Sequence, residues 1–124
     1  MILAILLLLT EIEGSPGAPV CTTLQSDCNS LGGIQAVIEY DPTLLAFQSF
    51  SAFKGLNYYN NKKRGEISFA IVHLTPALPS KIAEVCFQPL RAGTGELKLG
   101  HLVASNTLGR RLELETKKIA VKIE

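Results

Sequence analysis

The fold is decided by an alternating stretch in the first third of the chain, GGIQAVIEYDP at residues 32–42. Every second residue is apolar or aromatic, namely Ile34, Ala36, Ile38 and Tyr40. Successive side chains of a β-strand point to opposite faces, so this pattern predicts a strand with one buried face. The pair Asp41-Pro42 ends the strand, because proline cannot donate to the ladder and restricts the residue before it.

The same period of two recurs along the chain, and no helical pattern interrupts it. Further strands are expected within residues 20–25, 44–53, 67–72, 83–88, 97–99, 112–115 and 119–123. A bulge is expected near Ser49, where the aromatic spacing slips from even to odd. Loops are expected over residues 26–33, 54–65 and 75–79, which are rich in Gly, Asn or Pro. The pattern predicts one all-β, antiparallel sandwich domain of eight or nine strands.

The composition of the chain argues against two classes of function, nucleic-acid binding and membrane spanning. With 124 residues, 47% of them hydrophobic and a net charge of +1, the chain is a globular domain without the basic excess of nucleic-acid binders. Residues 2–9 are an unbroken apolar run, far shorter than the ~20 residues that span a bilayer, so no membrane span is expected. Residues 1–10 are interpreted as a truncated export signal or as the first strand, and residues 11–124 as the sandwich domain. The export interpretation predicts a secreted or cell-surface protein.

No motif for catalysis, cofactor or metal binding is present. The histidines His73 and His101 both follow expected strand ends, where they would be exposed turn residues, and no serine or cysteine lies in a nucleophile-elbow pattern. The sequence therefore predicts a protein that is not an enzyme and has no cofactor. The three cysteines lack a zinc-binding spacing. Either Cys21 and Cys28 form a disulfide that leaves Cys86 over, or the cysteines are small buried residues.

The ordered set of features resembles the cohesin-like family. The resemblance rests on GGIQAVIEYDPTLLAF at 32–47, the turn GSPG at 14–17, GEISFA at 65–70 and IAEVCF at 82–87, and extends from about Thr10 to Glu124. It implies a nine-stranded jelly-roll sandwich, a fold shared with related carbohydrate-binding modules. The best-known members are secreted or surface modules that bind dockerin domains to assemble polysaccharide-degrading complexes. Gly33, Gln35 and His73 stand where dockerin-binding members usually have Asn, Asp and Glu, and these departures bear on the partner, not on the fold.

The candidate contact residues lie on the predicted outer face of the two middle strands. If only the opposite face packs inward, exposed apolar residues alternate there with polar ones, which suits a protein partner. These residues are Gln35, Val37, Glu39, Ser68, Ala70, Val72 and His73. Tyr40, Asp41 and Pro42 are interpreted as a structural turn.

The expected function is an extracellular, non-catalytic module that binds a protein, either a dockerin or another surface or scaffold partner. A first alternative is a carbohydrate-binding module of the same fold, which would use Tyr58 and Tyr59 if their rings lay exposed side by side. A second alternative is a structural subunit or domain of an exported surface or secretion assembly.

Overall fold

The computed structural model describes residues 5–26, 31–53, 56–72 and 81–124, and every regular element in these ranges is a β-strand. The N-terminal strands are β1 (Ile5–Leu9), β2 (Ile12–Gly14), β3 (Val20–Ser26), β4 (Leu31–Glu39), β5 (Leu45–Ala52) and β6 (Leu56–Asn60). The C-terminal strands are β7 (Glu66–Val72), β8 (Lys81–Pro89), β9 (Gly93–Asn106), β10 (Leu114–Glu115) and β11 (Ile119–Ile123). No helix in these ranges is long and apolar enough to cross a membrane.

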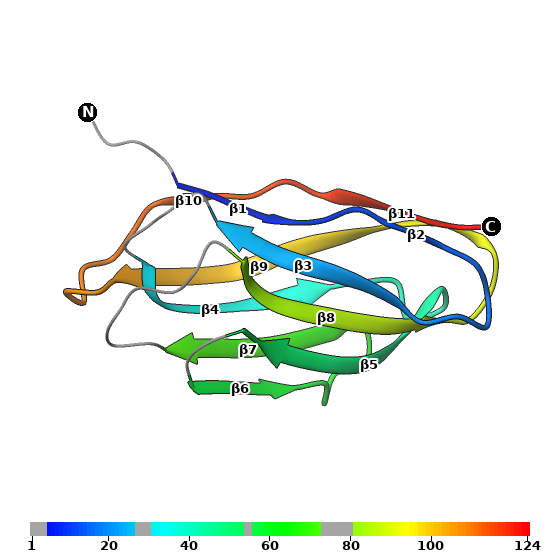
Figure 1. Cartoon of the computed structure of the whole chain (residues 1–124), viewed down its shortest axis with the longest axis horizontal. Helices are drawn as coiled ribbons and strands as arrows, with labels where there is room; N and C mark the ends of the chain where they lie inside the picture. Colours follow the sequence, from blue (N-terminus) through cyan, green and yellow to red (C-terminus); the bar gives the residue numbers. More distant parts are fainter. Residues whose placement is uncertain (1–4, 27–30, 54–55, 73–80) are drawn as a thin grey trace.

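The strands form two stacked sheets (Figure 1). One sheet has the order β10-β1-β3-β8-β5 and the other the order β2-β11-β9-β4-β7-β6. The segments β1 and β2 are one N-terminal strand that passes from the first sheet to the second, and β10 and β11 do the same at the C-terminus. Counted in this way, the eleven segments are nine strands. The predicted antiparallel jelly-roll sandwich is confirmed, with parallel pairing only where these two terminal strands meet.

The core lies between the two sheets and is built from the inward side of each alternating strand. Large side chains that are almost completely buried come from both sheets, including Leu24, Ile38, Ile67, Phe87 and Leu97. Burying one side chain of this size contributes about 1.5–3 kcal/mol, so the alternation that the sequence displays is also the main source of stability.

Ile5–Leu9 forms strand β1, which pairs with β3 and β10. Leu9 is buried in the core, and Thr10 joins β3 through its side chain and carbonyl group. The Thr22 hydroxyl donates to the Thr10 carbonyl oxygen at 2.6 Å, and the Thr23 N–H donates to Thr10 Oγ1 at 2.9 Å. This segment is thus a strand in the structure, and export with cleavage of residues 1–10 stays a prediction.

Two segments that the sequence predicted as loops contain strands. Leu31–Gly33 opens β4, where an added Cβ on Gly32 would lie 2.7 Å from the Asn106 carbonyl oxygen, so the glycine allows close backbone approach to β9. The Asn-rich segment Leu56–Asn60 is the edge strand β6, held by its pairing with β7. The bulge expected near Ser49 is confirmed by a register shift between Phe47 and Ser49. The expected loop at 75–79 lies outside the described residues.

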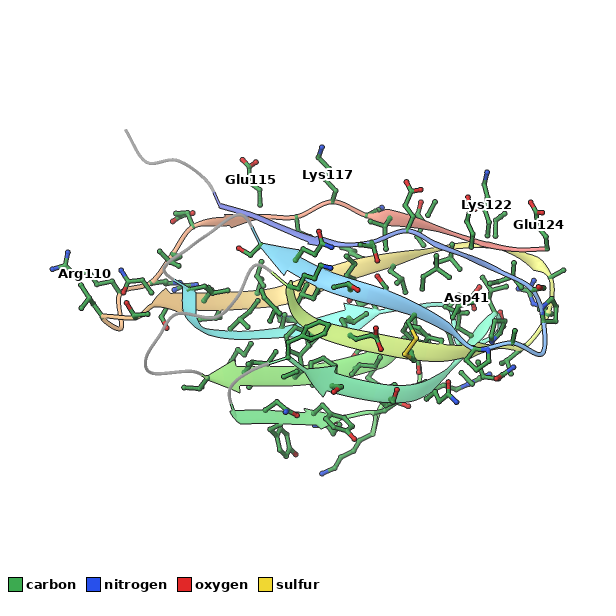
Figure 2. The ribbon with its side chains drawn as sticks, viewed as in Figure 1. Asp41, Arg110, Glu115, Lys117, Lys122 and Glu124 are labelled. Carbon is green, nitrogen blue, oxygen red and sulfur yellow. A yellow bond between two sulfur atoms is a disulfide. The ribbon has the colours of Figure 1, made fainter. Side chains whose placement is uncertain are left out.

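The structure corrects the disulfide expectation. Cys21 on β3 is bonded to Cys86 on β8, and the two residues are directly opposite each other in the register of these strands (Figure 2). Cys28 lies outside the described residues. Sequence reasoning offered only a disulfide between near neighbours along the chain, or buried cysteines without one, whereas pairing in the sheet brings together cysteines that are 65 residues apart. Glu84 lies close to both sulfur atoms, but a disulfide leaves no thiolate to bind a metal ion.

Candidate partner-binding face

Three rows of side chains cross strands β6, β7, β4 and β9 on the outer face of the six-stranded sheet. The middle row consists of Tyr58, Ala70, Gln35 and Val103. One flanking row contains Val72, Gly33 and Ser105, and the other contains Asn60, Ser68, Val37 and Gly100. Together with His101 we call these residues the uncharged face. It brings together five of the predicted contact residues, Gln35, Val37, Ser68, Ala70 and Val72, while His73 lies outside the described residues.

Among the described residues, charged side chains lie at the border of this face rather than within it. Glu39, the remaining predicted contact residue, stands opposite both Glu66 and Lys98, one row beyond Val37. The Lys98 ammonium is 4.0 Å from the Glu39 carboxylate, and the Lys63 ammonium is 3.4 Å from the Glu66 carboxylate. Figure 2 shows further charged side chains, such as Lys117 and Lys122, pointing outward along the β10–β11 edge. Apart from the Glu39 carboxylate, which lies against Gly100, a partner could cover the uncharged face without desolvating an ionised group of the described residues.

The uncharged face is exposed and partly apolar. Tyr58, Val72 and Val103 have 62%, 47% and 42% of their surface exposed. Single exposed apolar residues are ordinary on soluble proteins, but here they lie in adjoining rows of one flat sheet. Such an arrangement is typical of a protein contact surface, where an apolar centre is surrounded by a polar rim.

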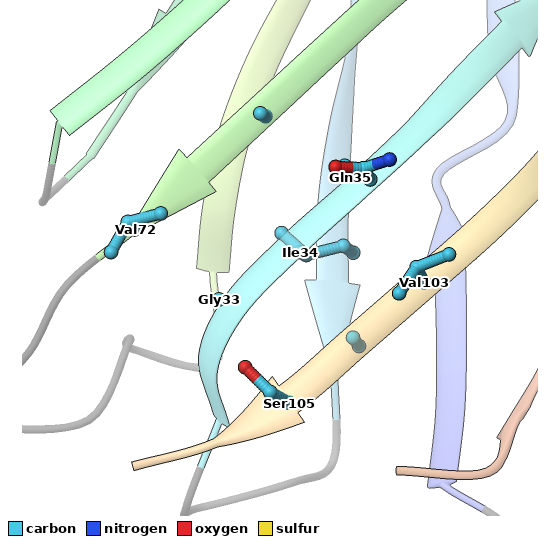
Figure 3. A pocket seen from close by; sticks show the side chains of 8 residues that line it. Gly33, Ile34, Gln35, Val72, Val103 and Ser105 are labelled. Carbon is cyan, nitrogen blue, oxygen red and sulfur yellow. The ribbon is translucent and has the colours of Figure 1, made fainter. Parts of the chain in front are cut away.

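Two shallow hollows lie on either side of Gln35. The first, of about 180 Å³, is lined by Gly33, Val72, Val103 and Ser105 (Figure 3). The floor of this hollow is open because Gly33 has no side chain. There is room for a Cβ at this position, since an added Cβ would meet only ordinary contacts, the nearest 3.4 Å away at Ser105 Oγ.

The second hollow, of about 220 Å³, is lined by Tyr58, Ser68, Ala70 and His101 beside Gln35. Each hollow is large enough for part of an apolar side chain. The two are thus candidate seats for side chains of a partner.

Apart from Asn60, whose Oδ1 accepts a hydrogen bond from the Lys62 N–H, four polar side chains of the uncharged face are not engaged by the described residues. Gln35, Ser68, His101 and Ser105 make no side-chain hydrogen bond with any of the described residues. Their donors and acceptors are therefore available to a partner, and a partner that covered them without pairing them would lose affinity.

The contribution of β9 was missed by the sequence analysis. His101 was expected in a turn, but it lies inside the 14-residue strand β9, where the register against β4 shifts between Gln35 and Val37. The inward apolar positions on β9 are Leu97, Leu99, Leu102 and Ala104, and the step from 99 to 102 breaks the period of two. An odd step in the apolar spacing also predicted the bulge near Ser49. The odd step from 99 to 102 could therefore have predicted a bulge in β9, but the sequence analysis placed a strand end there.

Tyr58 and Tyr59 point to opposite sides of β6. Tyr58 stands opposite Ala70 on the uncharged face, whereas Tyr59 stands opposite the buried Phe69. The Tyr59 ring packs against Phe47 and Phe50, with ring centroids 5.9 Å and 5.4 Å apart. Consecutive residues of a strand alternate in direction, so these two rings cannot form the side-by-side platform that the carbohydrate alternative requires.

The segment Tyr40-Asp41-Pro42 forms the turn that carries the chain from β4 in one sheet to β5 in the other. Tyr40 is buried, and its hydroxyl oxygen accepts a hydrogen bond from Asn61 Nδ2 at 3.0 Å. Asp41 Oδ1 accepts hydrogen bonds from the Thr43 hydroxyl at 2.6 Å and the Thr43 N–H at 2.9 Å. These hydrogen bonds, helped by the nearby Arg91 guanidinium, hold the pKa of Asp41 below its ordinary value of 3.8.

No protein-family model matches the sequence, and no curated protein matches it either. Solved structures do. The sixth cohesin of Acetivibrio cellulolyticus scaffoldin B, in complex with a mutant Cel5 dockerin, has a TM-score of 0.85 and 16% identity, covering 98% of this chain and 100% of that chain. A non-cellulosomal cohesin from the hyperthermophilic archaeon Archaeoglobus fulgidus has a TM-score of 0.86 and 14% identity, covering 98% and 92%.

The cohesin of the Coh-OlpA–Doc918 complex from Clostridium thermocellum also has a TM-score of 0.86, with 13% identity, and the likeness covers 98% of this chain and 100% of that chain. At sequence identities this low, the likeness shows a shared fold and does not show shared binding residues. The two-sheet topology and these likenesses together show that the chain has the fold of cohesin domains.

Proposed function

We propose that this chain is a non-catalytic module that binds a protein partner, a dockerin-type module, on the uncharged face. The observation that carries the proposal is the combination on one exposed sheet of apolar rows, two hollows and unengaged polar groups, with ionised groups paired at the border. The cohesin fold supports it, since two of the similar structures were solved with a dockerin bound.

The chemistry of the described residues supports binding rather than catalysis. A nucleophile requires a base within hydrogen-bond reach, yet the His101 side chain makes no hydrogen bond with a hydroxyl, thiol or carboxylate of these residues. The acidic groups near the uncharged face, Glu39 and Glu66, are half-exposed and paired with lysines. Both carboxylates are therefore engaged with lysine side chains and take no part in lining either hollow.

We infer that the module works outside the cytoplasm. The support is the disulfide between Cys21 and Cys86, because disulfides persist in oxidising compartments and are rare in the reducing cytosol.

The test is a matched pair of arginine substitutions on the same sheet. Ala70→Arg introduces a charge between the two hollows, and Ala120→Arg introduces the same charge on the exposed side of β11, outside the uncharged face. Binding would be measured by titration calorimetry against the Doc918 and Cel5 dockerins. We expect Ala70→Arg to weaken binding by about 100-fold, because the new charge is desolvated without a partner, and Ala120→Arg to leave binding unchanged.

Thermal unfolding of both variants controls for damage to the fold. Equal losses in the two variants, or full binding by Ala70→Arg, would place the partner elsewhere. Absence of binding by the unaltered chain to either dockerin would overturn the dockerin-type assignment.

A further inference from the structure

His101 has a backbone conformation that residues other than glycine rarely adopt. Its φ is +48°, and it is the one non-glycine residue with a positive φ in the described part of the chain. The other four positive-φ positions there are all glycines, at residues 17, 65, 93 and 109. A side chain in this region crowds the following carbonyl oxygen, so glycine is the residue that local energetics favours.

The conformation arises from the bulge in β9. His101 and Leu102 together occupy the space opposite Ala36, since the pairs Gln35–Val103 and Val37–Gly100 are on either side of them. In the common bulge whose first residue is left-handed, that residue is a glycine. Here the chain keeps a large side chain at the glycine position.

Nothing within the described residues offsets this strain. The His101 side chain is exposed and takes no part in a hydrogen bond, ion pair or ring contact with them. It instead lines the second hollow beside Tyr58 and Gln35. Strained backbone that persists without internal compensation is found mainly at functional sites.

We propose that His101 is a specificity-determining contact of this module, kept at a glycine position so that its imidazole reaches the partner. The inference rests on the proposed function. A neutral imidazole has one donor and one acceptor, and the other unengaged groups of the face are an amide and hydroxyls. The charged side chains Glu39 and Lys98, at the border of the face, are paired with each other. The partner group that fits is therefore an uncharged hydroxyl or amide side chain at the centre of its contact surface.

The experiment separates stability from binding. His101→Gly removes the imidazole and relieves the backbone, so its unfolding temperature should equal or exceed that of the unaltered chain, while its affinity for the Doc918 or Cel5 dockerin should fall about 10-fold or more. His101→Asn keeps a residue that tolerates positive φ and offers both a donor and an acceptor, and it should retain part of the affinity. Thr94→Gly, an exposed position of β9 beyond the uncharged face, is the matched control and should leave binding unchanged.

Each outcome decides. Loss of affinity in a His101→Gly variant of undiminished stability supports the inference. Full affinity in that variant, when Ala70→Arg has lost binding, overturns the role of His101 and leaves the proposed function standing. A lowered unfolding temperature in His101→Gly also overturns it, because the side chain would then contribute to folding. Failure of the unaltered chain to bind either dockerin overturns the proposed function, and this inference falls with it.

Discussion

The two outer faces of the sandwich are built by the same alternation but differ in chemistry. Two central rows on the outer face of the five-stranded sheet are Cys21–Cys86–Ser49 and Thr23–Glu84–Ser51. Both rows are polar, and a disulfide joins Cys21 to Cys86 within the first. On the six-stranded sheet the corresponding rows contain Tyr58, Val72 and Val103, all strongly exposed. The outer face of the five-stranded sheet thus carries a covalent link between two neighbouring strands. The outer face of the six-stranded sheet carries exposed apolar side chains and two hollows. A period of two therefore fixes which side chains face outward, but it does not fix what the outer face binds.

The largest effect on stability should come from the outer face of the five-stranded sheet. Replacing both Cys21 and Cys86 by Ser removes a cross-link that restricts the unfolded chain, which should lower the free energy of unfolding by about 2–4 kcal/mol. Dockerin binding should be unchanged at temperatures where the protein stays folded, because the disulfide lies on the outer face of the other sheet. Denaturant unfolding and calorimetry measure the two quantities.

A variant Cys28→Ser provides the control for this experiment. Peptide mapping without reductant should still find Cys21 joined to Cys86. A bond between Cys21 and Cys28 in the unaltered chain, or loss of dockerin binding together with the disulfide, would contradict the separation of the two faces.

An intermediate effect is expected from two adjacent glycines at the start of β4. Gly32→Ala places a Cβ 2.7 Å from the Asn106 carbonyl oxygen and 3.0 Å from Thr107 Cα, backbone atoms that cannot rotate away. It should cost about 1–3 kcal/mol of stability, as overpacking generally does. Gly33→Ala meets nothing closer than 3.4 Å and should not lower stability.

Gly33→Leu sharpens the comparison, since it should fill the first hollow and weaken dockerin binding while the fold persists. Denaturant unfolding of all three glycine variants measures the stabilities. Equal stability of Gly32→Ala and Gly33→Ala would show that β4 and β9 are not as close as the structure has them.

The smallest effect concerns the turn that joins the two sheets. The folded-state pKa of Asp41 is lowered, so its carboxylate stabilises the fold fully above the ordinary pKa of 3.8, and this contribution is lost as the pH falls below that value through the folded-state pKa. Asp41→Asn should reduce the acid sensitivity of the unfolding temperature only slightly, because the group is exposed. Glu113→Gln, at an exposed site with no ion pair to another described residue, is the control. An identical acid profile for Asp41→Asn and the unaltered chain would contradict the stabilising hydrogen bonds from Thr43.

Much of the fold could be predicted from local patterns. The alternation at residues 34–40 and the slip near Ser49 correspond to β4 and to the observed bulge in β5. The edge strand β6 could not be predicted, because its residues Leu-Asn-Tyr-Tyr-Asn show no apolar–polar alternation. Its place in the sheet comes from pairing with β7. The bulge at His101 in β9 corresponds to the three-residue spacing between Leu99 and Leu102, which is visible in the sequence. The glycine at position 100 instead favoured a strand end there.

The sequence by itself determined that the domain is a sandwich, and which side chains face the core in the strands that have a clear period of two, because alternate side chains of a strand point to opposite faces. Only the tertiary structure decided that Cys21 meets Cys86, that Tyr58 and Tyr59 separate, and that His101 joins Gln35 on one face. The reason is register: residues far apart in the chain become neighbours through the pairing of whole strands, and a single bulge changes which side chain reaches the surface.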